Sequence, residues 1–213
     1  ESMQQLAQDL AKQKIFAFDT ETTGLDAMLA EIVGLSFCYE KGTAYYIPTP
    51  ADKQEALAVI NIFKPILEDE KITKVGQNIK YDILLLAKYD VQVKGKLFDT
   101  MLAHYLIDPD TRHGMDILAE TYLGYSPISI TELIGAKGKN QGNMRDVEIE
   151  KVKEYAAEDA DITWQLYQKF EPLLKDNKTE DLAEKVEFPL VYTLAEIEKN
   201  GVKIDVDTLN TFS

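Results

Sequence analysis

A run of four apolar residues that leads directly into two carboxylates is the feature that most constrains this chain. Ile15–Phe18 has the length and composition of a buried strand, and Asp19 and Glu21 follow it in a polar stretch that reaches Gly24. In an extended chain, side chains two residues apart point to the same face. We therefore expect a strand that ends at Phe18 and presents two carboxylates on one face at the edge of a buried sheet.

Two carboxylates on one face repel each other. At about 4 Å the repulsion costs roughly 1 kcal/mol in bulk water and about 4 kcal/mol at the effective dielectric constant of a protein surface. A hard divalent cation is the usual reason for a fold to keep such a pair. The pattern alone is weak evidence, because a solvated pair is its default interpretation in so acidic a chain. The same Asp-x-Asp/Glu spacing occurs at Asp108/Asp110, Asp146/Glu148, Asp159/Asp161 and Asp205/Asp207.

Strand signals dominate the first part of the chain and helix signals the second. Two apolar runs on either side of residues 40–43 predict an antiparallel hairpin, and a further short run precedes a helical segment. The expected strands are 15–18, 32–39, 44–47 and 72–75, and the expected helices are 4–14, 54–67, 79–89, 101–107, 117–123, 147–153, 155–174 and 179–199. Asp99 and Asp116 are expected to cap helices. This order predicts an α/β fold, in which a mixed sheet with an antiparallel hairpin is flanked by helices.

Composition excludes several classes of protein. Cys38 is the single cysteine, which rules out a disulfide framework and a cysteine-rich zinc site. A net charge of −14 argues against a protein that coats nucleic acid by charge alone, but it permits an enzyme that meets nucleic acid at one small site. No apolar run approaches the roughly 18 residues of a membrane helix, and Glu1–Met3 begins no secretory signal. We expect a monomeric, cytoplasmic protein with no membrane partner.

Two further pairs of polar residues have helical spacing. Tyr155 and Asp159 lie four residues apart, which places a phenol and a carboxylate on one helix face. Asn78 and Asp82 have the same spacing around a predicted helix start. Taken singly, the first pair is typical of a tyrosine packed on the core beside an exposed aspartate, and Asn78 is typical of an N-cap.

In chain order, Asp19-x-Glu21 and these two pairs resemble the DEDD exonuclease superfamily in its tyrosine-bearing branch. Longer stretches resemble the 3′–5′ proofreading exonuclease domain of bacterial DNA polymerase I, a family A polymerase. These stretches are 16–22, 75–82, 98–102, 112–116 and 155–161, and the resemblance covers nearly the whole chain. Residues 188–205 resemble the opening of the polymerase domain in the same family. We therefore expect an exonuclease domain over 1–187 and the truncated start of a polymerase domain over 188–213.

The resemblance implies a ribonuclease H-like fold that hydrolyses the terminal phosphodiester of DNA with two divalent metal ions, Mg²⁺ or Mn²⁺, and releases nucleoside 5′-monophosphates. Asp19, Glu21 and Asp159 would hold the tighter ion. Asp19 would also reach the second ion, which Asp82 would hold directly or through water. Tyr155 would orient the attacking water together with Glu21. The chemistry agrees, because Mg²⁺ and Mn²⁺ favour oxygen ligands, and two ions about 3.5–4 Å apart can serve both the nucleophile and the leaving oxygen.

The contacts with DNA are also expected from the resemblance. Leu25 matches an apolar side chain that wedges the terminal bases apart. The polar residues that match family positions around the strand end and its phosphates are Gln77, Asn78, Lys80, Tyr81 and Arg112. Each has an ordinary alternative, such as loop packing for Leu25 or surface charge for Lys80. The implied partners are a single-stranded or frayed DNA 3′ end and the polymerase domain of the same full-length chain.

Five other residues are expected to have no catalytic role. His104 and His113 fall outside the motifs, so we expect them to be structural or surface residues. Glu158 and Asp161 point to other helix faces than their neighbour Asp159, and we expect them to be solvated. Cys38 lies in a predicted strand and is expected in the core.

Two other functions stay open at this point. One is a catalytically inactive exonuclease-like module that supports a polymerase, but the presence of all four acids and the tyrosine favours activity. The other is a related 3′–5′ exoribonuclease, which the polymerase-like residues after Phe188 disfavour.

Overall fold

One five-stranded sheet organises the chain, in the strand order β3-β2-β1-β4-β5. The computed structural model describes residues 2–212, so the ends of the two expected domains, Glu1 and Ser213, lie outside it. The strands are β1 (Ile15–Thr22), β2 (Ile32–Glu40), β3 (Thr43–Pro48), β4 (Thr73–Gly76) and β5 (Leu97–Asp99). β1 to β3 are antiparallel, whereas β4 and β5 run parallel to β1. The predicted mixed sheet with an antiparallel hairpin is confirmed.

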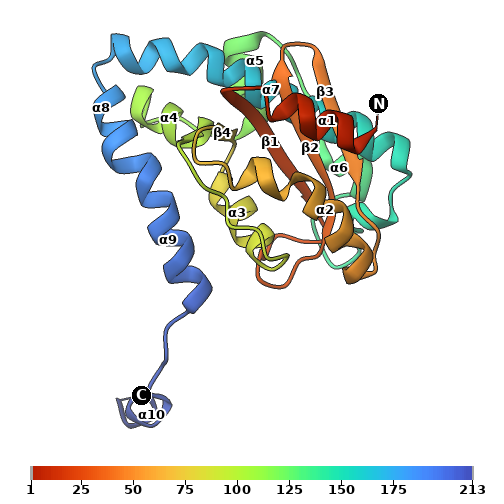
Figure 1. Cartoon of the computed structure of the whole chain (residues 1–213). Helices are drawn as coiled ribbons and strands as arrows, with labels where there is room; N and C mark the ends of the chain where they lie inside the picture. The colour runs from red at the N-terminus through yellow and green to blue at the C-terminus, as the bar shows by residue number, and fades with distance from the viewer. Residues whose placement is uncertain (1, 213) are drawn as a thin grey trace.

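Helices cover both faces of this sheet (Figure 1). They are α1 (Met3–Leu10), α2 (Lys53–Leu67), α3 (Ile79–Ala87), α4 (Thr100–Ile107), α5 (Met115–Leu123), α6 (Ile130–Ile134), the 3-10 turn η1 (Met144–Asp146), α7 (Ile149–Asp176), α8 (Glu180–Leu182), the π-helical turn η2 (Ala183–Glu187), α9 (Phe188–Asn200) and α10 (Val206–Phe212). α7 crosses one face and contacts β1 to β4. α2 packs on the other face, where Phe63 stacks on Phe37 of β2. No helix within residues 2–212 has the length and apolar composition that crossing a membrane requires.

The first strand is longer than expected. β1 does not end at Phe18; it pairs with β2 as far as Thr22, with an irregularity between Glu21 and Thr22. The prediction was wrong because polar side chains suggested a turn, whereas strand pairing depends on backbone groups that continue past them. Asp19 and Glu21 therefore lie inside β1 and share a face by strand alternation.

The faces of β1 have different neighbours. Phe16 contacts Phe37, which stacks on α2, so this face belongs to the apolar core. Asp19 and Glu21 alternate with Phe16 and Phe18 and therefore point to the opposite face, which α7 covers. Phe16 and the two acidic side chains thus lie on opposite faces of β1, while the apolar core extends to both faces, since it also includes Ala17 and buried residues of α7.

Several helix boundaries also differ from the prediction. The two helices expected at 147–153 and 155–174 are one continuous helix, α7, because no residue between them breaks it. The single helix expected at 179–199 is divided by the π-helical turn η2. β5 was not expected, since three residues are too few to show a strand period. α5 begins at Met115 with Gly114 at its N-cap, so Asp116 lies in the first turn instead of capping the helix.

The C-terminal part of the chain divides into a packed and an exposed helix. α9 packs along α3 and buries Phe188, Val191 and Ala195. It ends at Asn200, and the next residue, Gly201, has a φ of 67°, which favours glycine. α10 follows an extended segment and lies away from the sheet (Figure 1). The domain boundary expected at residue 188 coincides with the start of α9, and the assignment of α9 and α10 to a polymerase domain stays a prediction.

Candidate active site

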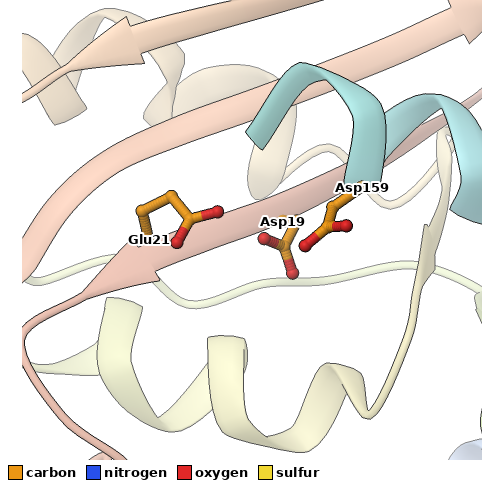
Figure 2. Close-up of side chains that lie close together, drawn as sticks. All are labelled: Asp19, Glu21 and Asp159. Atoms are coloured by element: carbon orange, nitrogen blue, oxygen red, sulfur yellow. The ribbon is translucent and has the colours of Figure 1, made fainter. Parts of the chain in front are cut away.

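Three of the expected acids meet where β1 and α7 cross. Asp19 and Glu21 come from β1 and Asp159 from α7, and one carboxylate oxygen of each lies within 4.8 Å of the others. Figure 2 shows the side chain of Asp159 descending from its helix toward Asp19 on the strand. Residues separated by about 140 positions in the sequence thus form one acidic cluster, which we define as Asp19, Glu21 and Asp159.

Burial makes this cluster unusual. Glu21 is 5% exposed and Asp159 is 9% exposed. The Oε1 atom of Glu21 is buried and has no hydrogen-bond partner among the described residues. An unpartnered buried oxygen costs free energy, and folded proteins rarely leave one without a reason. An all-carboxylate set of donors fits a hard cation such as Mg²⁺ or Mn²⁺, so the residues present are suited to the metal that the family pattern implies.

The same burial shifts the pKa of every acid in the cluster. Burial raises the pKa of Asp19 to about 7, although a hydrogen bond from the Thr20 backbone lowers it. The pKa of Glu21 lies well above its usual range because of burial and because of the charges of Asp19, Asp159 and Asp82. The pKa of Asp159 is also raised, by burial first and then by Asp19. A nearby cation would oppose these shifts, since it favours the ionised carboxylates.

The fourth expected acid, Asp82, lies beside the cluster but is held separately. It comes from the first turn of α3 and is 2% exposed. Its Oδ1 atom accepts hydrogen bonds from the Thr20 backbone N at 3.1 Å and from the Thr20 hydroxyl at 2.5 Å. Burial and the charge of Asp19 raise its pKa, so the two carboxylates are close enough to repel.

Asp99 fixes the helix that carries Asp82. Its two carboxylate oxygens accept hydrogen bonds from the backbone N of Asn78 at 3.2 Å and of Ile79 at 2.9 Å, at the start of α3. The Oδ1 atom also accepts from Met101 N at 2.9 Å, at the start of α4. The sequence predicted only the cap on α4. The cap on α3 is a tertiary contact between β5 and the preceding strand–helix turn. No local sequence pattern predicts such a contact.

Tyr155 faces the cluster from α7, one helical turn before Asp159. Burial is the main cause that raises the pKa of its phenol, and the charges of Asp159, Glu21 and Asp19 add to it. The hydroxyl therefore keeps its proton at neutral pH. The ring packs against a small apolar cluster around Val33 and Met144, which holds it in place.

A sequence profile of the 3′–5′ exonuclease domain of family A DNA polymerases matches residues 1–175. The chain belongs to this exonuclease family. DNA polymerase I of Pseudomonas aeruginosa is 40% identical over 210 residues, a match that covers 94% of this chain and 23% of the relative. The exonuclease chain therefore spans about a quarter of the length of this relative.

Solved structures confirm the exonuclease, ribonuclease H-like fold. The POL domain of Pol1 from M. smegmatis, in complex with DNA primer-template and dNTP, has a TM-score of 0.76 at 21% identity and covers 98% of this chain and 32% of its own. Brucella melitensis NrnC bound to pGG has a TM-score of 0.73 at 25% identity and covers 93% of this chain and 91% of its own.

The expected DNA contacts of the exonuclease lie around the end of β1 and the start of α3. Leu25 is 86% exposed in the loop that follows β1. The Tyr81 hydroxyl donates to the backbone oxygen of Gly24 and is 2.8 Å from the Thr22 hydroxyl, so it ties this loop to α3. Lys80 forms an ion pair with Glu198 of α9.

The other three residues expected to contact DNA are Gln77, Asn78 and Arg112, and their surroundings differ. The Gln77 amide donates to the backbone oxygen of His113 at 2.8 Å and accepts from the Thr100 hydroxyl, so it is used within the fold. Asn78 has a left-handed backbone with φ 59°, and its side chain makes no capping hydrogen bond. Asn78 thus occupies the N-cap position of α3, as that interpretation predicts, but without a capping hydrogen bond from its side chain. Arg112 is exposed, one residue before His113.

Two acids of α7 are not solvated as expected. Glu158 accepts hydrogen bonds from the Tyr125 hydroxyl and, at 2.7 Å, from the backbone N of Ile128. Asp161 accepts from the backbone N of Gly42 at 2.7 Å. Each carboxylate therefore holds a loop that is remote in sequence, which helical position alone does not reveal.

The expectations for the histidines and the cysteine fit the structure. His104 is 2% exposed, and its ring nitrogens lie 2.7 Å from His113 Nδ1 and 3.1 Å from the Tyr122 hydroxyl. These two histidines thus form part of a buried hydrogen-bonded group that ties α4 to α5. Cys38 is buried in β2, as expected.

Proposed function

We propose that this chain is the active 3′–5′ exonuclease domain of a DNA polymerase I, which hydrolyses the terminal phosphodiester of DNA and releases nucleoside 5′-monophosphates. One observation carries the proposal: Asp19, Glu21 and Asp159 converge beside Asp82 and Tyr155 in a chain of the exonuclease family. An inactive structural module is the weaker alternative. A module without catalysis gains nothing from a buried cluster of repelling acids or from an unpartnered Glu21 Oε1.

The acids are suited to two divalent ions, Mg²⁺ or Mn²⁺. Asp19, Glu21 and Asp159 would hold one ion, and Asp19 and Asp82 would serve the second. When bound, the two ions would supply a hydroxide-like nucleophile at neutral pH and would stabilise the negative charge on the leaving 3′ oxygen. The buried, all-oxygen donor set supports this assignment.

The proposed role of Tyr155 depends on the fact that its phenol keeps its proton. A phenol with a raised pKa is a poor base, so its Oη atom is suited to orienting the attacking water by hydrogen bonding and not to deprotonating it. Glu21 lies close enough to Tyr155 to raise that pKa, and it is the acceptor that would share the water. Replacing the tyrosine with phenylalanine would test this role, because it removes the hydroxyl and keeps the ring.

The substrate would enter as a single-stranded or frayed 3′ end. Leu25, which is exposed in the loop that follows the acid-bearing strand β1, would separate the last bases, and Lys80 and Arg112 would bind phosphates. Gln77, Asn78 and Tyr81 would also contact the DNA, from the turn that follows β4 and from the first turn of α3. A net charge of −14 opposes duplex binding, so a polymerase domain elsewhere in a longer chain would supply most of the duplex affinity.

A 3′-end degradation assay tests this function directly. It would compare single-stranded DNA, paired DNA, RNA and pGG, each with Mg²⁺, Mn²⁺ or EDTA, using the parent chain. We expect nucleoside 5′-monophosphates from single-stranded DNA in Mg²⁺ or Mn²⁺ and none in EDTA. No release under any condition would favour the inactive module. Faster release from RNA or pGG than from DNA would favour the exoribonuclease.

A further inference from the structure

The strand that carries the acids extends beyond its parallel neighbour. β1 pairs with β4 only over Ile15–Ala17, whereas its pairing with β2 continues to Thr22. On the side of β4, the last part of β1 therefore has a backbone edge that no strand within residues 2–212 covers. α3 begins just after β4 and brings Asp82 to this edge.

Asp82 is bound to the edge by one residue. The backbone N and the side-chain hydroxyl of Thr20 both donate to Oδ1 of Asp82, at 3.1 Å and 2.5 Å. Both residues are buried, with 7% and 2% exposure. A carboxylate oxygen has two lone-pair sites, so these two donors saturate Oδ1 and leave Oδ2 as the oxygen able to bind a further group.

Thr20 is well suited to hold a carboxylate in one orientation. Its side chain points to the face of β1 opposite Asp19 and Glu21, by strand alternation. It therefore reaches Asp82 without entering the acidic cluster. Its branched Cβ restricts the side-chain rotamer, so the hydroxyl is directed before any substrate or ion arrives. A hydrogen bond from a neutral hydroxyl to a carboxylate is among the stronger ones in proteins.

We propose that Thr20 is a positioning residue of the exonuclease reaction. It acts through Asp82, which it holds beside the acidic cluster with Oδ1 occupied and Oδ2 available to the second divalent ion or to its water. This rests on the proposed function, in which Asp82 serves that ion. Partners of this kind, which orient a metal-site carboxylate without touching the metal, typically change metal affinity or activity by about 10- to 100-fold when they are removed.

Three substitutions separate positioning from packing. Thr20→Val removes the hydroxyl and keeps the shape, and Thr20→Ser keeps the hydroxyl and removes a methyl group. Thr163→Val is the matched control, because Thr163 is fully buried in α7 and its hydroxyl has no partner among the described residues. The measurements are kcat and KM on single-stranded DNA in Mn²⁺, calorimetric titration with Mn²⁺ alone, and thermal unfolding.

We expect Thr20→Val to lower kcat by about 10- to 100-fold and to weaken the second Mn²⁺ binding event by about tenfold, with KM for DNA unchanged. Thr20→Ser should stay within about threefold of the parent, and Thr163→Val should match it. In an Asp82→Asn background, Thr20→Val should have no effect on Mn²⁺ binding. The double variant should therefore bind Mn²⁺ as weakly as Asp82→Asn alone.

Two results would overturn the proposal. One is parental Mn²⁺ binding in Thr20→Val. The other is an equal loss in Thr20→Val and Thr20→Ser together with a lowered melting temperature, which would mean that Thr20 matters only for packing. Failure of the proposed function has a different signature, since a parent chain that releases no nucleotide would still show whether Thr20 controls Mn²⁺ binding.

Discussion

Burial disfavours the ionised form of the carboxylates in the acidic cluster, and a nearby cation would oppose that effect. Burial raises the pKa of Asp19 to about 7, and the pKa of Glu21 and of Asp159 lies well above its usual range. Such shifts are concentrated where proteins bind cations or perform chemistry. The residues that destabilise the metal-free fold at neutral pH are thus the same residues that would give it affinity for divalent ions.

Replacing Asp19 tests the centre of this arrangement. Asp19→Ala should lower kcat on single-stranded DNA by about 10³-fold or more, because the site loses the acid proposed to serve both ions. The fold should remain intact, since the substitution also removes a repelling charge. The measurements are nucleotide release in Mg²⁺ and the circular dichroism spectrum. Asp110→Ala is the control, because Asp110 is an exposed acid in the same Asp-x-Asp spacing. Parental activity in Asp19→Ala would refute the site assignment.

At the level of single residues, the sequence predicted features that depend only on positions close together in the chain. The spacing of Asp19 and Glu21 predicted a shared face, and the structure confirms it. Sequence did not reveal that Glu158 and Asp161 hold remote loops, because their partners, such as Gly42, lie more than 25 positions away in the chain. The role of Thr20 was hidden for the same reason, since its partner Asp82 comes from another element.

At the level of elements, the contact between α3 and α9 places a predicted DNA contact, Lys80, beside a carboxylate of α9. Lys80 is paired with Glu198, and their side chains are 31% and 46% exposed. A phosphate of the substrate would have to compete with this carboxylate. The pair is on the surface, so it contributes at most about 1 kcal/mol.

Glu198→Gln should therefore strengthen the binding of a single-stranded oligonucleotide by about two- to fivefold at low salt, measured by fluorescence anisotropy. Glu196→Gln removes the same charge from the same helix and is the control, because Glu196 pairs with Lys199 instead. In a Lys80→Gln background, Glu198→Gln should have no effect. Equal strengthening by both glutamine variants would show that only net charge matters.

Asp99 is the residue on which two helices depend. Asp99→Ala should lower the free energy of unfolding by about 1–4 kcal/mol, because caps on α3 and α4 are lost together and each is worth about 0.5–2 kcal/mol. Urea denaturation measures this loss. Asp52→Ala removes the cap of α2 alone and should cost about 1 kcal/mol. Activity should fall only in the first variant, since α3 carries Asp82. Equal losses of stability would contradict the double cap.

Element boundaries were the least predictable level. Polar side chains obscured the extension of β1 to Thr22, and the short β5 has no readable period. The joining of two expected helices into α7 shows that a pause in apolar spacing does not end a helix when nothing breaks its hydrogen bonds. The order of strands and helices was predictable, because each longer element shows its own periodicity.

At the level of the whole molecule, the acidic cluster couples stability to pH and metal. The folded chain keeps protons on Asp19, Glu21 and Asp82 at pH values where the unfolded chain has released them. At these pH values the folded state therefore binds more protons than the unfolded state. The free energy of unfolding falls as pH rises through this range.

We therefore expect the melting temperature in EDTA to fall as pH rises from about 4.5 to 7, between the ordinary pKa of an aspartate and the pKa of Asp19, which is about 7. Mn²⁺ should restore it at pH 8. Thermal denaturation with and without Mn²⁺ measures both effects. The lowered pKa of His104 acts in the opposite direction, because it stabilises the folded state as pH rises, so it cannot cause the expected fall. Asp19→Ala should show a shallower pH dependence, and an unchanged dependence in that variant would contradict the explanation.

The alternation of side chains along β1 limits which insertions and deletions this sequence can accept during evolution. Phe16 and Phe18 face the core and Asp19 and Glu21 face the site, so a single inserted or deleted residue in β1 would exchange the two sets. It would turn phenyl rings toward α7 and carboxylates toward α2. Length variation should therefore be confined to flanking loops, such as residues 23–31, while β1 itself accepts substitutions but no change in length.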